Sequence, residues 1–508
     1  MLRGLSLVAV VALAAAFAYL VQPSGDNQNA HYALTRAFAD GRPDVDEIRG
    51  DGPERLQTND VVPFEGHLYA AKAPGLAAAA LPAYGVASAA GARTTGDPYK
   101  LEWFLHLWVT VLPAALMLVL ATKLGDRVAP GAGIVGAVVL GAATLVLPFS
   151  QLLFAHVLAT SLGFAAFFVL WREREGPPRP GLTAIAGGLA GLAVTVDYPL
   201  GLVAIALGLY VLARREARIR RGLAYAGGLA LGVLPAFAFN WWAFGDPTHF
   251  PYEGWTQPGG EPYPGLFGVN QPNLSVLLQL LLVPAGIAPI LAPALVGLVP
   301  MWRRGFRHEA VLVGGLAAAY VLYNASSSDP FGGASPGPRY LIPLLPFLTV
   351  PLAAAVRMSP GLVIGLAAGA GVIQALYSVT TPLAAWDGQA WERLRAGSVV
   401  TTVLDPLGLP ARVAIVPFGL LLLVAALAAL AAARVRIGVR EGFVAVVALA
   451  AWAVVTWQTP RFVHEGTGRE LALVLLVAAA CAAVAAAATV SPARRPAPVP
   501  ADSPPLRR

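Results

Sequence analysis

The sequence predicts an all-α, polytopic membrane protein with about 12–14 transmembrane helices, a number set by how many apolar runs reach bilayer length. Of its 508 residues, 57% are hydrophobic and only 12% are charged, whereas about a quarter of a typical soluble domain is charged. The apolar residues form runs of roughly 17–22, the length that crosses the hydrocarbon core. The basic residues gather in alternate loops, as the positive-inside rule requires.

The N-terminal part of the chain is expected to hold one anchor and one long polar loop. Residues 1–22 form the first predicted transmembrane helix, an uncleaved anchor, although the small residues of AAAFA leave a cleaved signal peptide as the alternative. Residues 23–101 are the predicted outer loop with interfacial helices. Within it, residues 27–40 suit a short amphipathic helix, and residues 73–90 are apolar but interrupted by prolines, as in an interfacial or re-entrant helix.

The predicted transmembrane core covers residues 102–490. Its longest apolar run, residues 182–213, would measure about 48 Å as one helix, too long for a hydrocarbon core of about 30 Å. Asp197-Tyr198-Pro199 lies at its midpoint, so two short spans are expected. The other spans are expected at residues 103–122, 131–147, 152–171, 223–244, 277–301, 311–323, 341–356, 362–377, 413–433, 444–457 and 471–490.

The charge distribution predicts how the chain is oriented. With residues 73–90 not spanning, every basic cluster falls on the same side, so both termini are expected in the cytoplasm and the polar loops outside. Residues 491–508 form a predicted disordered, basic cytoplasmic tail. The predicted location is therefore the plasma (inner) membrane. The net charge of +7 reflects this topology and contact with membrane lipids, and no basic block carries the interleaved aromatics of a nucleic-acid-binding protein.

The polar loop after the first helix concentrates candidate functional residues. Asp26 and His31 lie at the outer end of that helix, where a carboxylate could act as a general base or merely cap the next helix. Lys72 is the only lysine between the first span and Lys100. It is suited to pair with a phosphate, or to reach the interface by ordinary snorkelling.

Three charged residues further along the chain are also expected on the outer side. His156 lies just inside the outer end of a span, and Asp197 lies at the break of the long run, where a carboxylate needs a cation or hydrogen-bond donors. Arg339 follows the small residues of GGASPGP and is suited to grip a phosphate, or to pair with Asp329 or Asp197. Trp255 stands in an aromatic-rich outer loop, either in an interfacial belt or as a sugar-stacking residue.

No metal-ligand spacing is present in the sequence, and no cofactor is firmly indicated. A divalent metal ion is left open, with Asp26, Asp60 and His156 as its candidate ligands.

The first outer loop resembles that of GT-C fold glycosyltransferases, which include the bacterial aminoarabinose transferase and the protein mannosyltransferases. The likeness consists of a span ending in an acid, an amphipathic outer helix and a Gly-(His/Leu)-Tyr-x-x-Lys-x-Pro turn. The matching residues are Asp26, Tyr32, Gly66, Tyr69, Lys72 and Pro74. The stretch GPRYLIPLLPF, residues 337–347, resembles a segment of bacterial relatives. The usual Asp-Glu pair of the family is Asp26-Asn27 here.

The resemblance implies a GT-C-like bundle and the inverting transfer of a sugar from a polyprenyl-phosphate donor. The acceptor would be an envelope lipid, glycan or protein on the extracytoplasmic face. Asp26 would be the base, Lys72 a phosphate contact, and Tyr69 a further substrate contact. Two other hypotheses are a transporter or flippase for a lipid-linked envelope precursor and a non-catalytic assembly subunit. The outer placement of the polar residues, and the scarcity of charge within the spans, favour the transferase.

Overall fold

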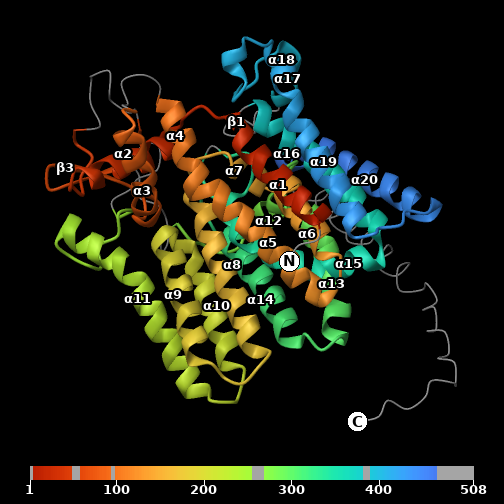
Figure 1. Cartoon of the computed structure of the whole chain (residues 1–508), viewed down its shortest axis with the longest axis horizontal. Helices are drawn as coiled ribbons and strands as arrows, with labels where there is room; N and C mark the ends of the chain where they lie inside the picture. Colours follow the sequence, from red (N-terminus) through yellow and green to blue (C-terminus); the bar gives the residue numbers. More distant parts are fainter. Residues whose placement is uncertain are drawn as a thin grey trace. The chain divides into compact units, whose positions relative to one another are not determined.

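The computed structural model describes residues 4–47, 58–92, 98–253, 268–333, 335–380 and 389–465. They belong to one compact unit that ends at Glu465, built of helices and, within these ranges, two short antiparallel strand pairs (Figure 1). The predicted span at 471–490, the predicted tail at 491–508 and Trp255 lie outside the described residues.

The N-terminal elements follow the prediction, with one addition. In chain order they are α1 (Gly4–Tyr19), β1 (Leu20–Val21), α2 (Asp26–Ala39), β2 (Val61–Phe64), β3 (His67–Ala70) and α3 (Gly75–Ala89). Helices α2 and α3 confirm the two helices expected in the polar loop. The hairpin β2–β3 was not predicted. Its two-residue turn, Glu65-Gly66, has positive φ angles at both positions, as a type I′ hairpin turn requires.

The next helices build the centre of the unit. Helix α4 (Pro98–His106), a π-helical turn (Leu107–Val111) and α5 (Leu112–Val128) run on without interruption, so that residues Lys100–Val128 make one long apolar helix. Helix α6 (Gly133–Ala142), the short α7 (Val146–Phe149) and α8 (Ala155–Arg174) follow. Helix α8 packs against α5 and also against the next helix.

The break expected in the long apolar run is confirmed. Helix α9 (Pro180–Val196) ends before Asp197, a single 3₁₀ turn (Tyr198–Leu200) follows, and α10 (Gly201–Leu212) continues. The hydroxyl of Tyr320 donates to the carbonyl of Pro199 at 2.9 Å and so ties the break to a later helix.

Helix α11 (Arg218–Phe244) lies directly on α9 because both present glycines at the contact. A Cβ atom at Gly228 would lie 2.0 Å from the carbonyl oxygen of Ala184, so no larger residue fits there without separating the helices. Figure 1 shows α9, α10 and α11 running side by side. Small residues allow this close approach of helices in lipid.

Two predicted spans are corrected. The span expected at residues 131–147 is interrupted after Ala142, where α6 ends, and α7 begins only at Val146. Residues 277–301 form two helices, α12 (Leu274–Leu282) and α13 (Ala288–Arg303). The sequence Val283-Pro284-Ala285-Gly286 turns the chain between them, with the amide of Gly286 bonded to the carbonyl of Val283 at 2.6 Å. Pro284 has no backbone N–H group and cannot continue the hydrogen bonds of α12. Ala285 and Gly286 complete the turn instead.

The remaining helices complete the unit. They are α14 (Arg307–Ala325), a 3₁₀ helix (Arg339–Leu344) leading into α15 (Leu345–Met358), α16 (Pro360–Thr380), α17 (Ala390–Ala396), α18 (Ala411–Ala414), α19 (Val416–Ala432) and α20 (Val439–Glu465). Between α17 and α18, strand β4 (Thr401–Thr402) pairs with β1. The first helix is thereby joined to the C-terminal helices, and α1 packs along α19.

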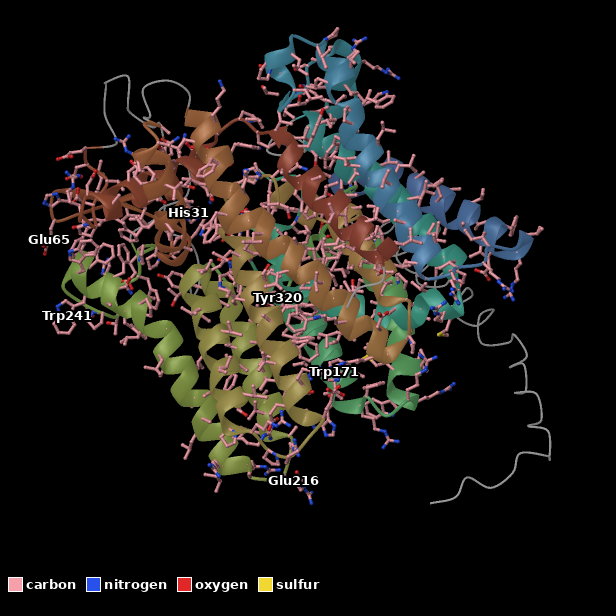
Figure 2. All side chains as sticks on the ribbon, in the orientation of Figure 1. His31, Glu65, Trp171, Glu216, Trp241 and Tyr320 are labelled. Carbon is pink, nitrogen blue, oxygen red and sulfur yellow. The ribbon has the colours of Figure 1, made fainter. Side chains whose placement is uncertain are left out.

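The structure is an all-α polytopic membrane fold. Seven helices within the described residues are long and apolar enough to cross a bilayer by length and composition, and six more apolar helices are shorter. The basic clusters meet at one end of the bundle, where Arg127 pairs with Glu175 at 3.0 Å and Arg357 donates to the carbonyl of Pro130 at 2.7 Å. Figure 2 shows Glu216 near that end and His31 at the opposite one. Which end faces the cytoplasm stays a prediction.

Candidate functional site

A buried hydrogen-bonded pair, His156 and Asp197, lies at the base of the candidate site. His156 enters in the first turn of α8, and Asp197 caps the C-terminus of α9 at the break. The Nδ1 atom of His156 lies 2.5 Å from Oδ2 of Asp197, and both residues are buried. The pairing satisfies a carboxylate that the helix break would otherwise leave without a donor near the membrane interior.

Arg339 lies near the His156–Asp197 pair, at the start of the 3₁₀ helix that precedes α15. Its guanidinium carbon lies 5.5 Å from the ring centres of both Phe154 and Tyr340, and the Tyr340 ring also meets the His156 ring at 5.9 Å. The expected pairing of Arg339 with Asp329 or Asp197 is absent from the ion pairs of the described residues. Asp329 instead accepts the amides of Gly332 and Gly333.

The loop before Arg339 is shaped to leave room for the guanidinium. Gly332 has a φ of +79°, and a Cβ atom at that position would lie 2.3 Å from the Nε atom of Arg339. The Nε atom is buried and, within the part of the chain that the structure describes, has no hydrogen-bond partner. The small size of Gly332 therefore allows the Arg339 side chain to approach the backbone closely.

Lys72 brings a second cation to the same place. Its Nζ atom lies 2.6 Å from Oδ2 of Asp60, and only 4% of Lys72 is exposed. Burial lowers the pKa of Lys72, with Arg339 lowering it further, while Asp60 and Asp26 oppose the shift. The two cations are thus near each other, and Asp60 is the carboxylate in direct contact with Lys72.

His31 lies near enough to Lys72, His156 and Arg339 to feel their charges. It is buried on α2, and its Nδ1 atom has no hydrogen-bond partner among the described residues. Burial, and then the charges of Lys72, His156 and Arg339, hold the pKa of His31 well below its usual value. The imidazole is therefore neutral at physiological pH.

Asp26 lies at the open edge of the cluster, in the first turn of α2. It is exposed, and its carboxylate accepts from the backbone amide of Asn59 at 3.2 Å and from the Asn59 side chain at 3.4 Å. A carboxylate near a helix N-terminus is stabilised by the helix dipole, but Gly25 is the N-cap residue, so Asp26 is not needed as the cap. The side chain is both solvent-accessible and close enough to Lys72 to affect its pKa.

Comparison with solved structures identifies the architecture. The structure of ArnT from Cupriavidus metallidurans bound to undecaprenyl phosphate superposes with a TM-score of 0.51 over 89% of this chain and 77% of that chain, at 16% sequence identity. The apo ArnT structure gives a TM-score of 0.50 over 90% and 76% of the two chains, at 17% identity. The chain has the GT-C fold.

Other comparisons add little to this assignment. The oligosaccharyltransferase from Archaeoglobus fulgidus in the apo form gives a TM-score of 0.44 over 84% of this chain and 55% of that chain, at 12% identity. No protein-family model matches the sequence. No curated protein matches it either.

The remaining sequence candidates lie at different places in this GT-C fold. Among the described residues, Tyr69, on β3, makes no hydrogen bond or ring contact with Lys72 or Arg339. Its ring packs on those of Phe244, at 4.8 Å between ring centres, and Phe64, at 6.3 Å. Burial raises the pKa of the Tyr69 hydroxyl, as do the nearby acids of the hairpin. Trp255 lies outside the described residues, so its expected contact with substrate stays a prediction.

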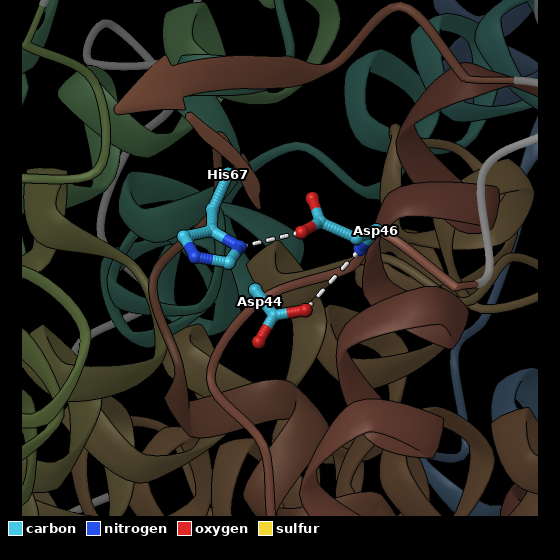
Figure 3. A group of neighbouring side chains, drawn as sticks. All are labelled: Asp44, Asp46 and His67. Carbon is cyan, nitrogen blue, oxygen red and sulfur yellow. Dashed lines mark hydrogen bonds and ion pairs between the residues drawn. The ribbon is translucent and has the colours of Figure 1, made fainter. Parts of the chain in front are cut away.

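Two acids after α2 and a histidine on β3 form a group that could hold a metal ion (Figure 3). Asp44, Asp46 and His67 offer ligand atoms that all lie within 4.8 Å of one another. These groups also satisfy each other: His67 Nδ1 lies 2.6 Å from Asp46, whose second oxygen accepts the amide of Leu68 at 2.6 Å. The bond to Asp46 raises the pKa of His67. The suggested ligands Asp26, Asp60 and His156 do not form such a group among the described residues, and metal dependence stays a prediction.

Sequence reasoning missed one buried acid beside the site. Glu102, in α4, is 4% exposed, and both of its carboxylate oxygens lie 2.7 Å from the hydroxyl of Ser24, two residues before Asp26. The available signal was an acid directly before the apolar run at residues 103–122. Ionisable residues at such positions generally face a partner or a cavity.

The neutral state of His31 predicts a pH-dependent stability. Its pKa in the folded protein lies well below 6.5, so between these two values the unfolded chain binds a proton that the folded protein does not. The free energy of unfolding therefore does not depend on His31 titration above about pH 6.5. Below that pH it falls, by up to about 1.4 kcal/mol per pH unit. Thermal unfolding between pH 7 and pH 5 should show a steeper loss for wild type than for His31→Gln.

The matched control is the exposed His308, in α14. His308→Gln should keep the wild-type pH dependence. Equal slopes for wild type and His31→Gln would contradict a neutral, buried imidazole.

Proposed function

We propose that this protein is a glycosyltransferase that moves a sugar from a polyprenyl-phosphate donor to an envelope acceptor on the extracytoplasmic face. The observation that carries the proposal is that two cations, Lys72 and Arg339, lie near one accessible carboxylate, Asp26. Lys72 and Arg339 interact with each other electrostatically, Lys72 also interacts with Asp26, and Asp26 is exposed at the edge of the cluster. This arrangement suits a reaction in which a phosphate leaves and an acceptor proton is removed.

In the proposed reaction, the acceptor hydroxyl oxygen attacks the anomeric carbon of the donor sugar from the side opposite the phosphate. The bond between that carbon and the phosphate oxygen breaks, and its electron pair stays on the phosphate. Lys72 and Arg339 neutralise the charge that develops there. Asp26 takes the acceptor proton, so the products are an inverted glycoside and a polyprenyl phosphate.

The membrane setting supports a lipid-linked donor. The cation cluster lies at the end of short apolar helices, next to the break at Asp197. ArnT, whose fold is similar, was solved with undecaprenyl phosphate bound. A long apolar tail would remain in the bilayer while the phosphate reaches Lys72 and Arg339. Placing this end of the bundle outside the cell follows from the basic clusters at the other end.

The test is donor consumption by purified protein in lipid nanodiscs. Supplied with radiolabelled polyprenyl-phosphate sugars, the wild type should release polyprenyl phosphate. Lys72→Met and Arg339→Met should each lower kcat/KM for the donor by about 100-fold, since each removes a charge-assisted contact to the phosphate.

The matched controls are exposed cations of α5 and α13, Lys123 and Arg303. Lys123→Met and Arg303→Met should keep wild-type turnover. A wild type that consumes none of the donors would overturn the proposal, and so would passage of intact donor across the bilayer without release of polyprenyl phosphate.

A further inference from the structure

A cavity that the proposed mechanism does not use lies beside the start of α2. Its volume is about 560 Å³, and it is bounded by β1, the first turns of α4 and the segment that carries β4. Volumes of about 300–1,000 Å³ are usual for small-molecule sites. Pro23 lines the cavity, three residues before Asp26.

Gln22, one of the residues that line the cavity, carries a buried and unsatisfied acceptor. The residue is only 6% exposed. Its Nε2 atom donates to Oε1 of Gln151 and to the carbonyl of Ser378, both at 2.8 Å. Its Oε1 atom has no hydrogen-bond partner among the described residues. A buried amide oxygen left without a donor costs free energy, so a ligand that supplies a hydroxyl proton at this position would be stabilised.

The other walls are suited to a neutral, polyhydroxylated molecule. The indole N–H of Trp103 is already bonded to the carbonyl of Ala18 at 2.9 Å, so the ring offers the cavity an apolar surface. Lys100 and Asp405 bring charges of opposite sign to the same cavity. Asp405 disfavours a phosphate, and both charges disfavour an alkyl chain. Hydroxyl groups can donate to Asp405 and accept from Lys100.

We propose that this cavity binds the saccharide part of the acceptor. The inference rests on the proposed function and specifies its second substrate. The cation cluster would hold the donor phosphate on one side of Asp26, and the cavity would hold an acceptor sugar on the other. Ser24, between Gln22 and Asp26 in the chain, is bonded to Glu102, the neighbour of Trp103. This contact couples the cavity wall to the start of α2.

The test measures binding and needs no donor. Full-length protein in nanodiscs is mixed with maltotriose, cellotriose or mannotriose, and saturation-transfer difference NMR reports contact with the sugar ring protons. At least one trisaccharide should bind to wild type. Ser398→Trp places a bulky ring at an exposed position in the cavity wall, and Gln22→Leu removes the amide. Each should weaken binding at least tenfold.

Matched controls separate these effects from general damage. Ser88→Trp, exposed at the end of α3, and Gln279→Leu, in α12, should leave saccharide binding unchanged. Failure of all three trisaccharides to bind to wild type overturns the inference, as does full binding by both cavity variants.

The two proposals fail separately. If the protein consumes donor but binds no saccharide, the saccharide site is rejected and the transferase proposal stands. If it binds saccharide but consumes no donor, the transferase proposal is rejected and the cavity remains a saccharide site. Thermal unfolding of Ser398→Trp in nanodiscs should match that of the wild type. Folding of that variant is thereby confirmed in the same preparation.

Discussion

Asp26→Asn is expected to lower sugar transfer by about 100- to 10,000-fold, the usual contribution of a positioned general base. The substitution keeps the shape of the side chain and its contact with Asn59, but an amide cannot accept a proton. The effect should fall on kcat, because Lys72 and Arg339, the proposed contacts of the donor phosphate, are untouched. Transfer is measured with radiolabelled donor at saturating concentration, and donor binding is measured separately.

Asp40 provides the control at the other end of the same helix. It follows the last residue of α2 and is exposed, so Asp40→Asn removes one negative charge without touching the cluster and should keep full activity. If Asp26→Asn keeps wild-type kcat, Asp26 is not the base. The half-buried Asp60 and the buried Glu102 would then be tested in the same way.

Arg221→Met should be among the most destabilising substitutions in the chain, by about 3–5 kcal/mol, because it removes the nearest cation from a buried carboxylate. Only Arg214, at 3.9 Å, and the amide of Arg179 then remain beside Glu173. Arg221 and Glu173 are both fully buried at the basic end of the bundle. The guanidinium meets the two carboxylate oxygens at 2.9 and 2.7 Å and also donates to the carbonyl of Val211 at 2.7 Å. Thermal unfolding in nanodiscs, with the bound lipid held constant, measures the loss.

The neighbouring Arg220 is exposed, and Arg220→Met should change stability by less than about 0.5 kcal/mol. The double variant Arg221→Met with Glu173→Met should recover most of the stability, since replacing both members of a buried pair by apolar residues is often close to neutral. A single Arg221→Met variant as stable as wild type would show that Glu173 finds another donor.

The apolar pattern of the sequence was enough to predict most helices and the break at Asp197. A 32-residue run cannot cross a bilayer as one helix, and a proline beside a carboxylate marks the interruption. The split between α12 and α13 was missed because residues 277–301 stay apolar through the turn, so hydropathy shows no change there. The β2–β3 hairpin was missed because its strands have only four residues each.

The candidate site was predictable only in part. The sequence indicated Asp26, Lys72, His156, Asp197 and Arg339 one at a time, by chemistry and by position relative to the spans. The one pairing that it suggested, Arg339 with Asp329 or Asp197, is absent from the ion pairs of the described residues. Helix packing decides which groups meet. Lys72 contacts Asp60, and Asp197 is bonded to His156 rather than to Arg339. Gln22 carried no signal at all, because an amide near the end of an apolar run resembles an ordinary interfacial residue.

The break at Asp197 has a consequence for the surrounding lipid. Helix α9 has 17 residues and α10 has 12, so they extend about 25 Å and about 18 Å along their axes, less than a hydrocarbon core of about 30 Å. Both present apolar side chains to their surroundings, among them Ile185 and Ile205. Such hydrophobic mismatch thins the adjacent leaflet. The headgroup layer would then lie closer to the bilayer centre beside Arg339. A lipid phosphate would reach the proposed contacts Lys72 and Arg339 without leaving the headgroup layer.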